Sequence, residues 1–276
     1  MQATIIFHHL CDKNNFEFDL ERIEEAIDEQ EIDALILTDP IYSAGVDVPE
    51  IVYEKLSAIS AKRGVWLICD HSLGGLNWQL PLSLIDVAKV NILQSTPRSI
   101  NIDSITKRLF LNGLKHALIV ASDFVIALVH DLTSSISGGL CSAQLSLLEA
   151  LFAPQNESDI LSFMDQNRRR IKSHYLLLQS ALNGTQYSTY NSDSSYFSMI
   201  CHKTVRIRDV DSKRTVSRLL YRHDLYVLPS EHFHYVKNSR FGFRVNLVNN
   251  MSRSLPIIIG ALSHDTELLR DLGHLI

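Results

Sequence analysis

Short apolar runs separated by amphipathic stretches dominate the first half of the chain. The runs at residues 34–37 and 65–69 are typical of buried strands. The stretches at residues 18–27 and 49–62 have the apolar spacing of helices that pack on one face. This alternation predicts βαβ units, a mainly parallel sheet and helices on both of its faces. A further short strand is expected at residues 3–7.

The pattern changes after residue 155. Residues 158–182 form one long amphipathic stretch, which predicts a helix. Strand-like runs follow at residues 196–200 and 240–248, an order that favours a small antiparallel sheet. We therefore expect an α/β fold with a large domain at residues 1–155 and a smaller α+β domain at residues 156–276.

Composition and charge narrow the class of protein. The 276 residues carry a net charge of -5 without a long run of either sign, which argues against a surface for nucleic acid or anionic membrane. No apolar run reaches the roughly 20 residues that span a bilayer. The four cysteines are widely spaced, which favours reduced thiols in a cytoplasmic protein. The histidines show no metal-ligand spacing, so no metal site is expected.

Four segments, in order along the chain, resemble the fold-type I pyridoxal-phosphate (PLP) enzymes of the aminotransferase class I/II family. Residues 34–45 resemble the strand and Asn-Pro turn whose second Asn bonds the cofactor ring hydroxyl, and Tyr42 occupies that place. Residues 65–73 resemble the strand that ends in the Asp paired with the pyridine nitrogen. The resemblance assigns this role to Asp70, whereas Leu73 replaces a Tyr that contacts the ring oxygen.

The third segment resembles the one that carries the cofactor lysine, in which a strand ends in a Ser-x-Ser-Lys-like sequence. Here Phe124–Val129 is expected to be the strand, and Ser134 or Ser135 stands at the lysine's place. Cys141 or Ser142 falls where an Arg would hold the cofactor phosphate. Because a hydroxyl cannot form an imine with PLP, the resemblance implies a chain without the cofactor lysine.

The fourth segment comprises residues 219–233 and 243–247, and it resembles the C-terminal domain with its substrate-clamping Arg. Arg244 fits that Arg, although a role as a structural ion-pair partner stays open. No Gly-rich phosphate-binding turn precedes a helix before residue 30, so an N-terminally truncated family member is expected. The long interval before the serine-rich turn implies an insertion around residues 77–120.

Alternative roles remain for two residues at the expected site. Asp70, at the carboxyl end of a parallel strand, lies where ligands bind in such sheets, or it caps a neighbouring loop. His130 is a candidate base, because some sugar dehydratases of the superfamily use a His in the lysine's place. His130 lies about four residues before that place, and a surface histidine is the competing interpretation.

These losses predict a cofactor-free, non-catalytic pseudoenzyme subunit without covalent PLP, and a biosynthetic pathway is its expected setting. We expect a homodimer, or a heterodimer with a complete aminotransferase paralogue. The alternative is an enzyme that uses noncovalent PLP or another small amino-acid-like ligand. In that case Asp70, His71, His130 and Arg244 would face one cleft between the domains.

Overall fold

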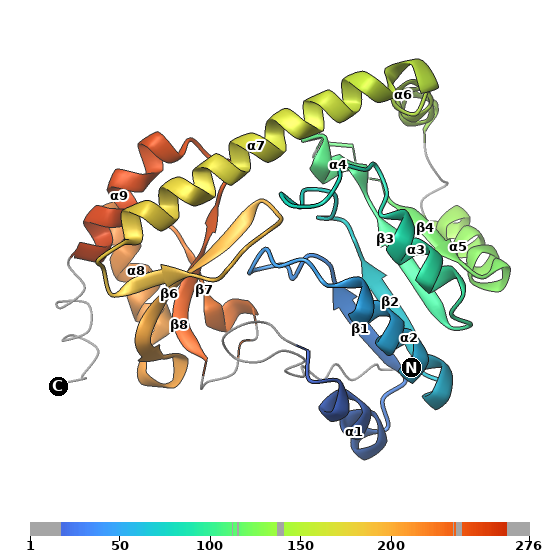
Figure 1. The fold of residues 1–276 in the computed structure, drawn as a ribbon, viewed down its shortest axis with the longest axis horizontal. Helices are drawn as coiled ribbons and strands as arrows, with labels where there is room; N and C mark the ends of the chain where they lie inside the picture. Colours follow the sequence, from blue (N-terminus) through green and yellow to red (C-terminus); the bar gives the residue numbers. More distant parts are fainter. Residues whose placement is uncertain are drawn as a thin grey trace.

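The chain is built around two four-stranded sheets. The computed structural model describes residues 18–263 apart from residues 112, 115, 137–140, 234 and 236–238, so the strand expected at residues 3–7 lies outside the described residues. The long helix α7 (Glu157–Leu182) runs past both sheets, from the helices of the first half to those of the second (Figure 1).

The first sheet has the strand order β1-β2-β3-β4. Its first three strands are parallel and the fourth is antiparallel to β3. The strands are β1 (Ala34–Thr38), β2 (Trp66–Asp70), β3 (Ser99–Asp103) and β4 (Leu118–Ala121). The helices of this half are α1 (Leu20–Gln30), α2 (Glu50–Arg63), α3 (Val87–Gln94), α4 (Ile105–Arg108), α5 (Asp123–Ile136) and α6 (Ser142–Leu151).

Local sequence sets the ends of these helices. The Asp19 carboxylate accepts a hydrogen bond of 3.1 Å from the Arg22 amide and so caps α1. Gly64 ends α2 in the left-handed conformation, with φ of 69°, which costs glycine little because it has no Cβ. The inner face of α2, with Tyr53 and Leu56, is buried in the core that also holds Leu67 of β2.

Residues 124–129 form part of helix α5, so the strand predicted there is wrong. The run is apolar at every position, and such a run does not distinguish a strand from a helix by its periodicity. The chain instead places its strand earlier, at β4, and α5 begins directly after Ser122, whose carbonyl accepts a hydrogen bond from the Ile126 amide. Phe124 and Leu132 on α5 are exposed.

The interpretation of residues 77–120 as an insertion is wrong as well. These residues contain α3, β3, α4 and β4, and both strands belong to the first sheet. Residues 142–151 form α6, and this helix has no buried residue among those described.

The second sheet is antiparallel throughout and has the order β5-β6-β8-β7, as expected for the C-terminal half. The α/β class with a mainly parallel sheet and a second, antiparallel sheet is therefore confirmed. The elements are the 3-10 helix η1 (Pro154–Asn156), α7, β5 (Tyr187–Thr189), β6 (Phe197–Arg206), η2 (Ile207–Asp209), α8 (Ser212–His223), β7 (Leu228–Pro229), η3 (Ser230–Phe233), β8 (Arg240–Asn246) and α9 (Met251–Ser263).

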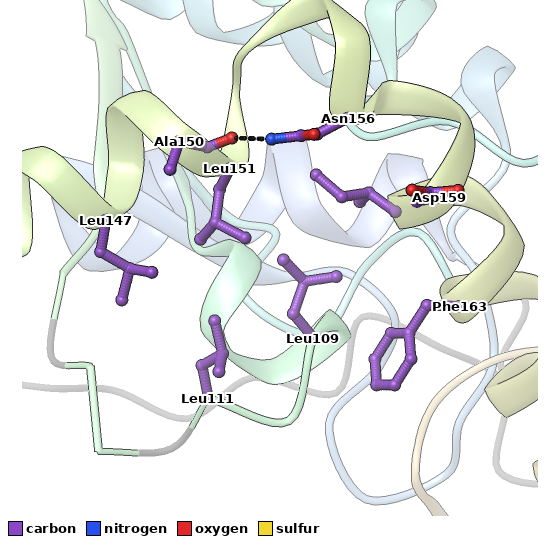
Figure 2. A pocket seen from close by; sticks show the side chains of 9 residues that line it. Leu109, Leu111, Leu147, Ala150, Leu151, Asn156, Asp159 and Phe163 are labelled. Atoms are coloured by element: carbon purple, nitrogen blue, oxygen red, sulfur yellow. Dashed lines mark hydrogen bonds between the residues drawn. The ribbon is translucent and has the colours of Figure 1, made fainter.

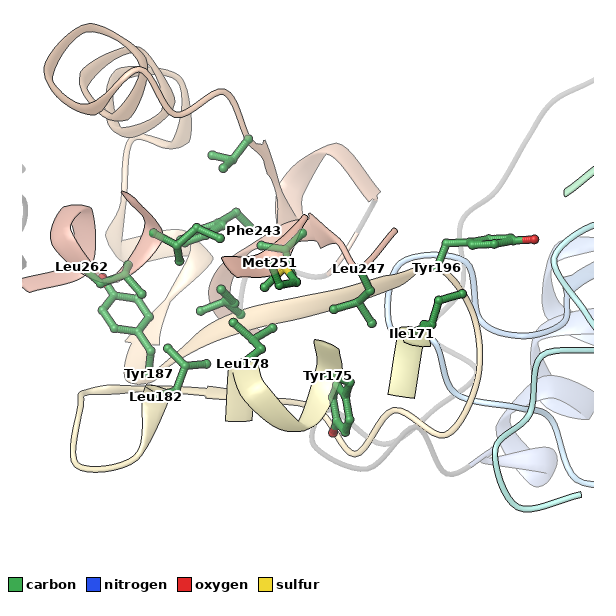
Figure 3. Close-up of a cluster of buried hydrophobic side chains, with 14 of the residues drawn as sticks. Ile171, Tyr175, Leu178, Leu182, Tyr187, Tyr196, Phe243, Leu247, Met251 and Leu262 are labelled. Carbon is green, nitrogen blue, oxygen red and sulfur yellow. The ribbon is translucent and has the colours of Figure 1, made fainter. Parts of the chain in front are cut away.

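One apolar core joins the second sheet to α7 and α9. Figure 3 shows Tyr175 and Leu178 of α7 in one cluster with Phe243 of β8 and Met251 of α9. Leu73, which follows β2, is buried in the same core, so the first sheet is tied to the second by apolar contact. No helix within the described ranges is long and apolar enough to cross a membrane.

A buried ion cluster fixes the turn after β1. Asp39 is 2% exposed, and its carboxylate accepts hydrogen bonds from the Val48 amide, the Tyr53 hydroxyl and the Lys89 ammonium at 2.9, 2.8 and 2.7 Å. Lys89, on α3, is 3% exposed. Although burial lowers the pKa of Lys89, the carboxylates of Asp39 and Asp47 raise it further, so the ammonium stays charged.

Asp47 extends this cluster to the C-terminal half. Its carboxylate accepts hydrogen bonds from Asn77 and Lys89 at 3.0 and 3.4 Å, and its amide donates to the Asp193 carboxylate at 2.8 Å. Burial, together with repulsion from Asp39, raises the pKa of Asp47 to about 6. Burial also raises the pKa of Asp193.

Replacing Lys89 by methionine is expected to lower the free energy of unfolding by about 3–5 kcal/mol, because Asp39 would keep a buried, unpaired charge. Chemical denaturation measures the change. Lys62→Met is the matched control, since Lys62 pairs with Glu24 at the surface and its side chain is 64% exposed. The control substitution should lower the free energy of unfolding by no more than about 1 kcal/mol. Equal losses in the two variants would show that the buried pair is unimportant.

Asp47→Asn should change how stability depends on pH. The pKa of Asp47 is about 6 in the folded chain, above the ordinary value of 3.8 for this side chain, so between these pH values the folded state holds a proton that the unfolded state has released. This contribution to stability is present below about pH 4 and is lost as the pH rises through 6. Asn does not titrate, so the variant does not lose this stability. The difference in free energy of unfolding between the variant and the wild type should therefore shift by roughly 3 kcal/mol in favour of the variant from pH 4 to pH 7.

Denaturation curves across that pH range provide the measurement for Asp47→Asn. The exposed Asp28→Asn variant should follow the wild-type curve, because Asp28 pairs with Arg63 at the surface and its side chain is 50% exposed. If the free energy of unfolding had the same pH dependence in the wild type and in Asp47→Asn, the elevated pKa of Asp47 would be contradicted.

Candidate active site

The carboxyl ends of three parallel strands meet at one edge of the first sheet. Thr38 of β1 lies opposite Asp70 of β2, and Asp70 lies opposite Ile102 of β3. The turn after β1, the end of β2 and the segment after β3 therefore start from the same edge. Ligands of open α/β sheets bind outside the carboxyl ends of the strands.

Asp70 ends β2 and is half-buried. One carboxylate oxygen accepts a hydrogen bond of 2.8 Å from the Ser72 amide, which is the loop-capping role left open above. His71 does not lie beside Asp70 at the surface. It is 3% exposed, and its Nε2 atom lies 3.0 Å from the Tyr53 hydroxyl. Burial and the nearby Lys89 charge lower the pKa of His71 to about 4. His71 is therefore neutral at pH 7.

Arg244 of β8 lies among three aromatic rings. Its guanidinium carbon lies 5.1 Å from the ring centre of Tyr42, 4.1 Å from that of Phe197 and 4.8 Å from that of Phe233. Cation–π attraction stabilises a guanidinium over such rings. The structure thus brings together Tyr42 and Arg244, two of the residues predicted from the sequence, from opposite halves of the chain.

The Arg244 Nη1 atom is buried and has no hydrogen-bond partner among the described residues. Leaving a buried charged donor unpaired costs free energy, and such groups in native proteins normally have partners. The structural ion-pair role considered for Arg244 is not seen within the described ranges. A guanidinium with flat apolar walls and an unsatisfied donor suits a planar anion such as a carboxylate.

The structure does not bring Ser134 or His130 to this edge. Both lie on α5, where Ser134 is exposed and the His130 side chain is 77% exposed, 3.7 Å from the Asp131 carboxylate. Ser135 donates its hydroxyl to the Asp131 carbonyl within the same helix. These placements follow from the helix at residues 123–136 and leave His130 as a surface histidine. Cys141 and Ser142 follow at the start of α6.

Lys107, rather than Ser134, ends a serine- and threonine-rich sequence that directly follows a strand of the first sheet. Ser104, Ile105, Thr106 and Lys107 follow the last residue of β3 in a Ser-x-Thr-Lys order, which matches the Ser-x-Ser-Lys-like pattern. Lys107 is exposed, on the single-turn helix α4. The inference of a missing lysine depended on the wrong strand, so it loses its structural basis. The motif itself was the signal that could have identified Lys107.

Charged and polar bonds fix the turn that carries Lys107. The Ser104 hydroxyl caps α4 at the Thr106 amide, 3.3 Å away, and donates to the His116 carbonyl at 2.9 Å. Arg108, 1% exposed, pairs with Asp103 at 2.5 Å and donates to the Gly74 carbonyl at 2.7 Å. The α4 turn is therefore tied to the segment that follows Asp70.

An apolar cavity of about 380 Å³ lies next to the end of α4. Figure 2 shows Leu109 and Leu111 on one side and Leu147, Leu151 and Phe163 around them, contributed by the segment after α4 and by α6 and α7. None of the residues predicted from the sequence lines it. Its lining offers few polar groups to bind a charged ligand.

Solved aminotransferases share this fold. An aromatic aminotransferase from Pyrococcus horikoshii superposes with a TM-score of 0.76 at 15% identity, covering 93% of this chain and 65% of that one. The aspartate aminotransferase from Thermus thermophilus with maleate gives 0.73 at 18% identity, covering 91% and 60%. The aspartate aminotransferase from Thermotoga maritima gives 0.72 at 18% identity, covering 91% and 60%. The chain thus spans about three fifths of their length.

A comparison with curated proteins gave no match. The family model described as aminotransferase class I and II matches residues 1–255, which is most of the chain. The matched residues include every strand of the two described sheets. The chain belongs to the aminotransferase class I and II family.

Proposed function

We propose that this chain is an aminotransferase-type enzyme that binds PLP through Lys107 and Asp70 and the carboxylate of an amino-acid-like ligand through Arg244. The position of Lys107 carries the proposal. It follows β3 in a Ser-x-Thr-Lys order, at the same sheet edge as Asp70 on the neighbouring parallel strand. An exposed lysine at the same sheet edge as a half-buried carboxylate is a chemically suitable pair for an aldehyde cofactor with a ring nitrogen.

Two of the residues present fit PLP, and a third fits the carboxylate of its ligand. Lys107 would hold the cofactor by its amine, Asp70 would face the ring nitrogen, and the unpartnered Nη1 of Arg244 would bind a ligand carboxylate. Bound PLP supplies an electron sink for amino-acid chemistry. The protein's own part is to orient the ligand between Arg244 and Lys107 and to keep negative charge at Asp70.

Two residues differ from the family pattern, and both differences should weaken the binding of the PLP ring. Leu73 is buried in the core of the second sheet, so it offers no hydroxyl to the ring oxygen. Tyr42 replaces the Asn of the turn and packs its ring near Arg244. Fewer polar contacts with the cofactor predict modest affinity for PLP.

The second candidate is a non-catalytic subunit without PLP that acts with a partner, either a second copy or a complete aminotransferase paralogue. The burial of Leu73 favours it, because that side chain now serves the apolar core. An enzyme with noncovalent PLP lies between the two candidates. Chemical reduction of any bond between PLP and a lysine distinguishes these three candidate functions.

Incubation with PLP and then borohydride should attach the cofactor to Lys107, because reduction makes an imine between amine and aldehyde permanent. Peptide mass spectrometry locates the added mass. Lys107→Ala should abolish the labelling, whereas Lys55→Ala, which removes an exposed lysine from α2, should leave it intact. Labelling spread equally over surface lysines would contradict the proposal, and PLP bound without any labelling would favour the noncovalent enzyme.

Arg244→Lys should weaken the binding of maleate about 10-fold to 100-fold, because a charge-assisted pair of hydrogen bonds contributes roughly 1.5–3 kcal/mol. Maleate is a suitable probe because it accompanies the related Thermus thermophilus enzyme. Calorimetry on the PLP-treated protein gives the affinity. The control is Arg169→Lys, whose side chain is 80% exposed and pairs with Asp165. Equal affinities in the wild type and Arg244→Lys would exclude Arg244 from the ligand site.

A further inference from the structure

A side chain from the second half of the chain contacts the turn that carries Lys107. Tyr196 immediately precedes β6, and its ring is 5% exposed in the core of the second sheet. Figure 3 shows this ring at the edge of the core, with its hydroxyl pointing away from the other side chains. That hydroxyl donates a hydrogen bond to the backbone carbonyl of Lys107. Burial raises the pKa of Tyr196, so the hydroxyl keeps the proton that it donates.

Helix α4 is a single turn, and contacts from other segments help to hold it. The helix comprises only Ile105–Arg108, and the chain leaves it at Phe110 with φ of 57°, a left-handed conformation that is uncommon for a bulky residue. The last carbonyls of a helix lack the usual partners. The Lys107 carbonyl accepts from the Phe110 amide at 3.1 Å, and the Tyr196 hydroxyl uses its remaining capacity.

Aromatic packing holds the end of the same turn. The Phe110 ring meets the Tyr196 ring edge to face, with 5.4 Å between centroids, and meets Phe163 of α7 at 6.3 Å. The guanidinium of Arg170, also on α7, lies 5.6 Å from the centre of the Phe110 ring. The lysine turn is thus held by Tyr196, which precedes β6, and by two side chains of α7, all from the second half of the chain.

We infer that Tyr196 is a positioning residue for Lys107. Its hydroxyl fixes the backbone from which the amine projects and makes the placement of Lys107 depend on how the second sheet packs against the first. Tyr196 acts through the backbone of Lys107 and has no assigned contact with cofactor or ligand. The inference rests on the proposed function in so far as Lys107 is the cofactor lysine.

The test uses Tyr196→Phe, which removes the hydroxyl and keeps the ring against Phe110. Tyr175→Phe is the matched control, since it deletes a buried hydroxyl that donates to the Tyr190 carbonyl at 2.7 Å. The first readout is the PLP concentration for half-maximal borohydride labelling of Lys107. It should rise about 2-fold to 10-fold in Tyr196→Phe, as loss of one net hydrogen bond implies, and stay unchanged in Tyr175→Phe.

Amide hydrogen exchange without PLP is the second readout. Peptides that contain Leu109 and Phe110 should exchange faster in Tyr196→Phe, measured relative to peptides from β2 so that any loss of global stability cancels. Unchanged exchange in these peptides would overturn the inference, and so would labelling equal to the wild type. If the wild type shows no labelling of Lys107 while the exchange changes as expected, the proposed function fails and the role of Tyr196 in holding the turn stands.

Should Tyr196→Phe fail to fold, Phe163→Leu loosens the same clamp from α7 and leaves the hydroxyl bond in place. It should raise exchange at Leu109 and Phe110 by a smaller factor. Identical exchange in that variant and the wild type would then count against a clamped lysine turn.

Discussion

The buried carboxylate of Asp39 is the constraint on which the site depends. Three donors satisfy it, from the turn itself, from α2 and from α3. A buried charge of this kind tolerates only the arrangement that keeps its partners. It therefore fixes the turn at residues 39–48, and this turn presents Tyr42 to Arg244 and Asp47 to Asp193. This anchored loop is one of the places where the two halves of the chain meet.

The close approach of the halves also depends on Gly45. Its φ is 67°, and a Cβ at this position would lie 2.5 Å from the Phe197 carbonyl and 2.6 Å from the Ser194 carbonyl. The Gly45 carbonyl accepts hydrogen bonds from the amides of Asp193 and Ser194, both at 3.0 Å. Any other residue would push the loop before β6 away from the turn. This loop leads directly into Tyr196 and Phe197. Tyr196 bonds to the Lys107 turn, and Phe197 flanks Arg244.

Local patterns revealed much of the fold and part of the site. The runs at β1 and β2, the length of α7 and the strand around Arg244 follow from apolar periodicity, and so does the order of the two sheets. Asp70 was identifiable because a strand-terminal Asp has a fixed place in a parallel sheet. The strand predicted at residues 124–129 was wrong because a uniformly apolar run has no periodicity that distinguishes a strand from a helix. As a result, the lysine motif was sought at Ser134 instead of at Lys107.

The remaining site features arise from contacts between distant parts of the chain. Asp39 and Lys89 are 50 residues apart, and no local spacing indicates that they pair. The aromatic surroundings of Arg244 come from the turn after β1, the start of β6 and η3, so only the assembled sheets reveal them. The bond from Tyr196 to Lys107 likewise crosses between the halves.

A crystal structure of the full chain grown with PLP would test the central claim most directly, because the claim places Lys107, Asp70 and Arg244 around one ligand. The account predicts continuous electron density from the Lys107 Nζ atom to the cofactor, with the Asp70 carboxylate within hydrogen-bond distance of the ring nitrogen and Arg244 facing the same space. PLP bound at another place, or Lys107 directed to solvent beside an unliganded Asp70 in crystals saturated with the cofactor, would contradict it.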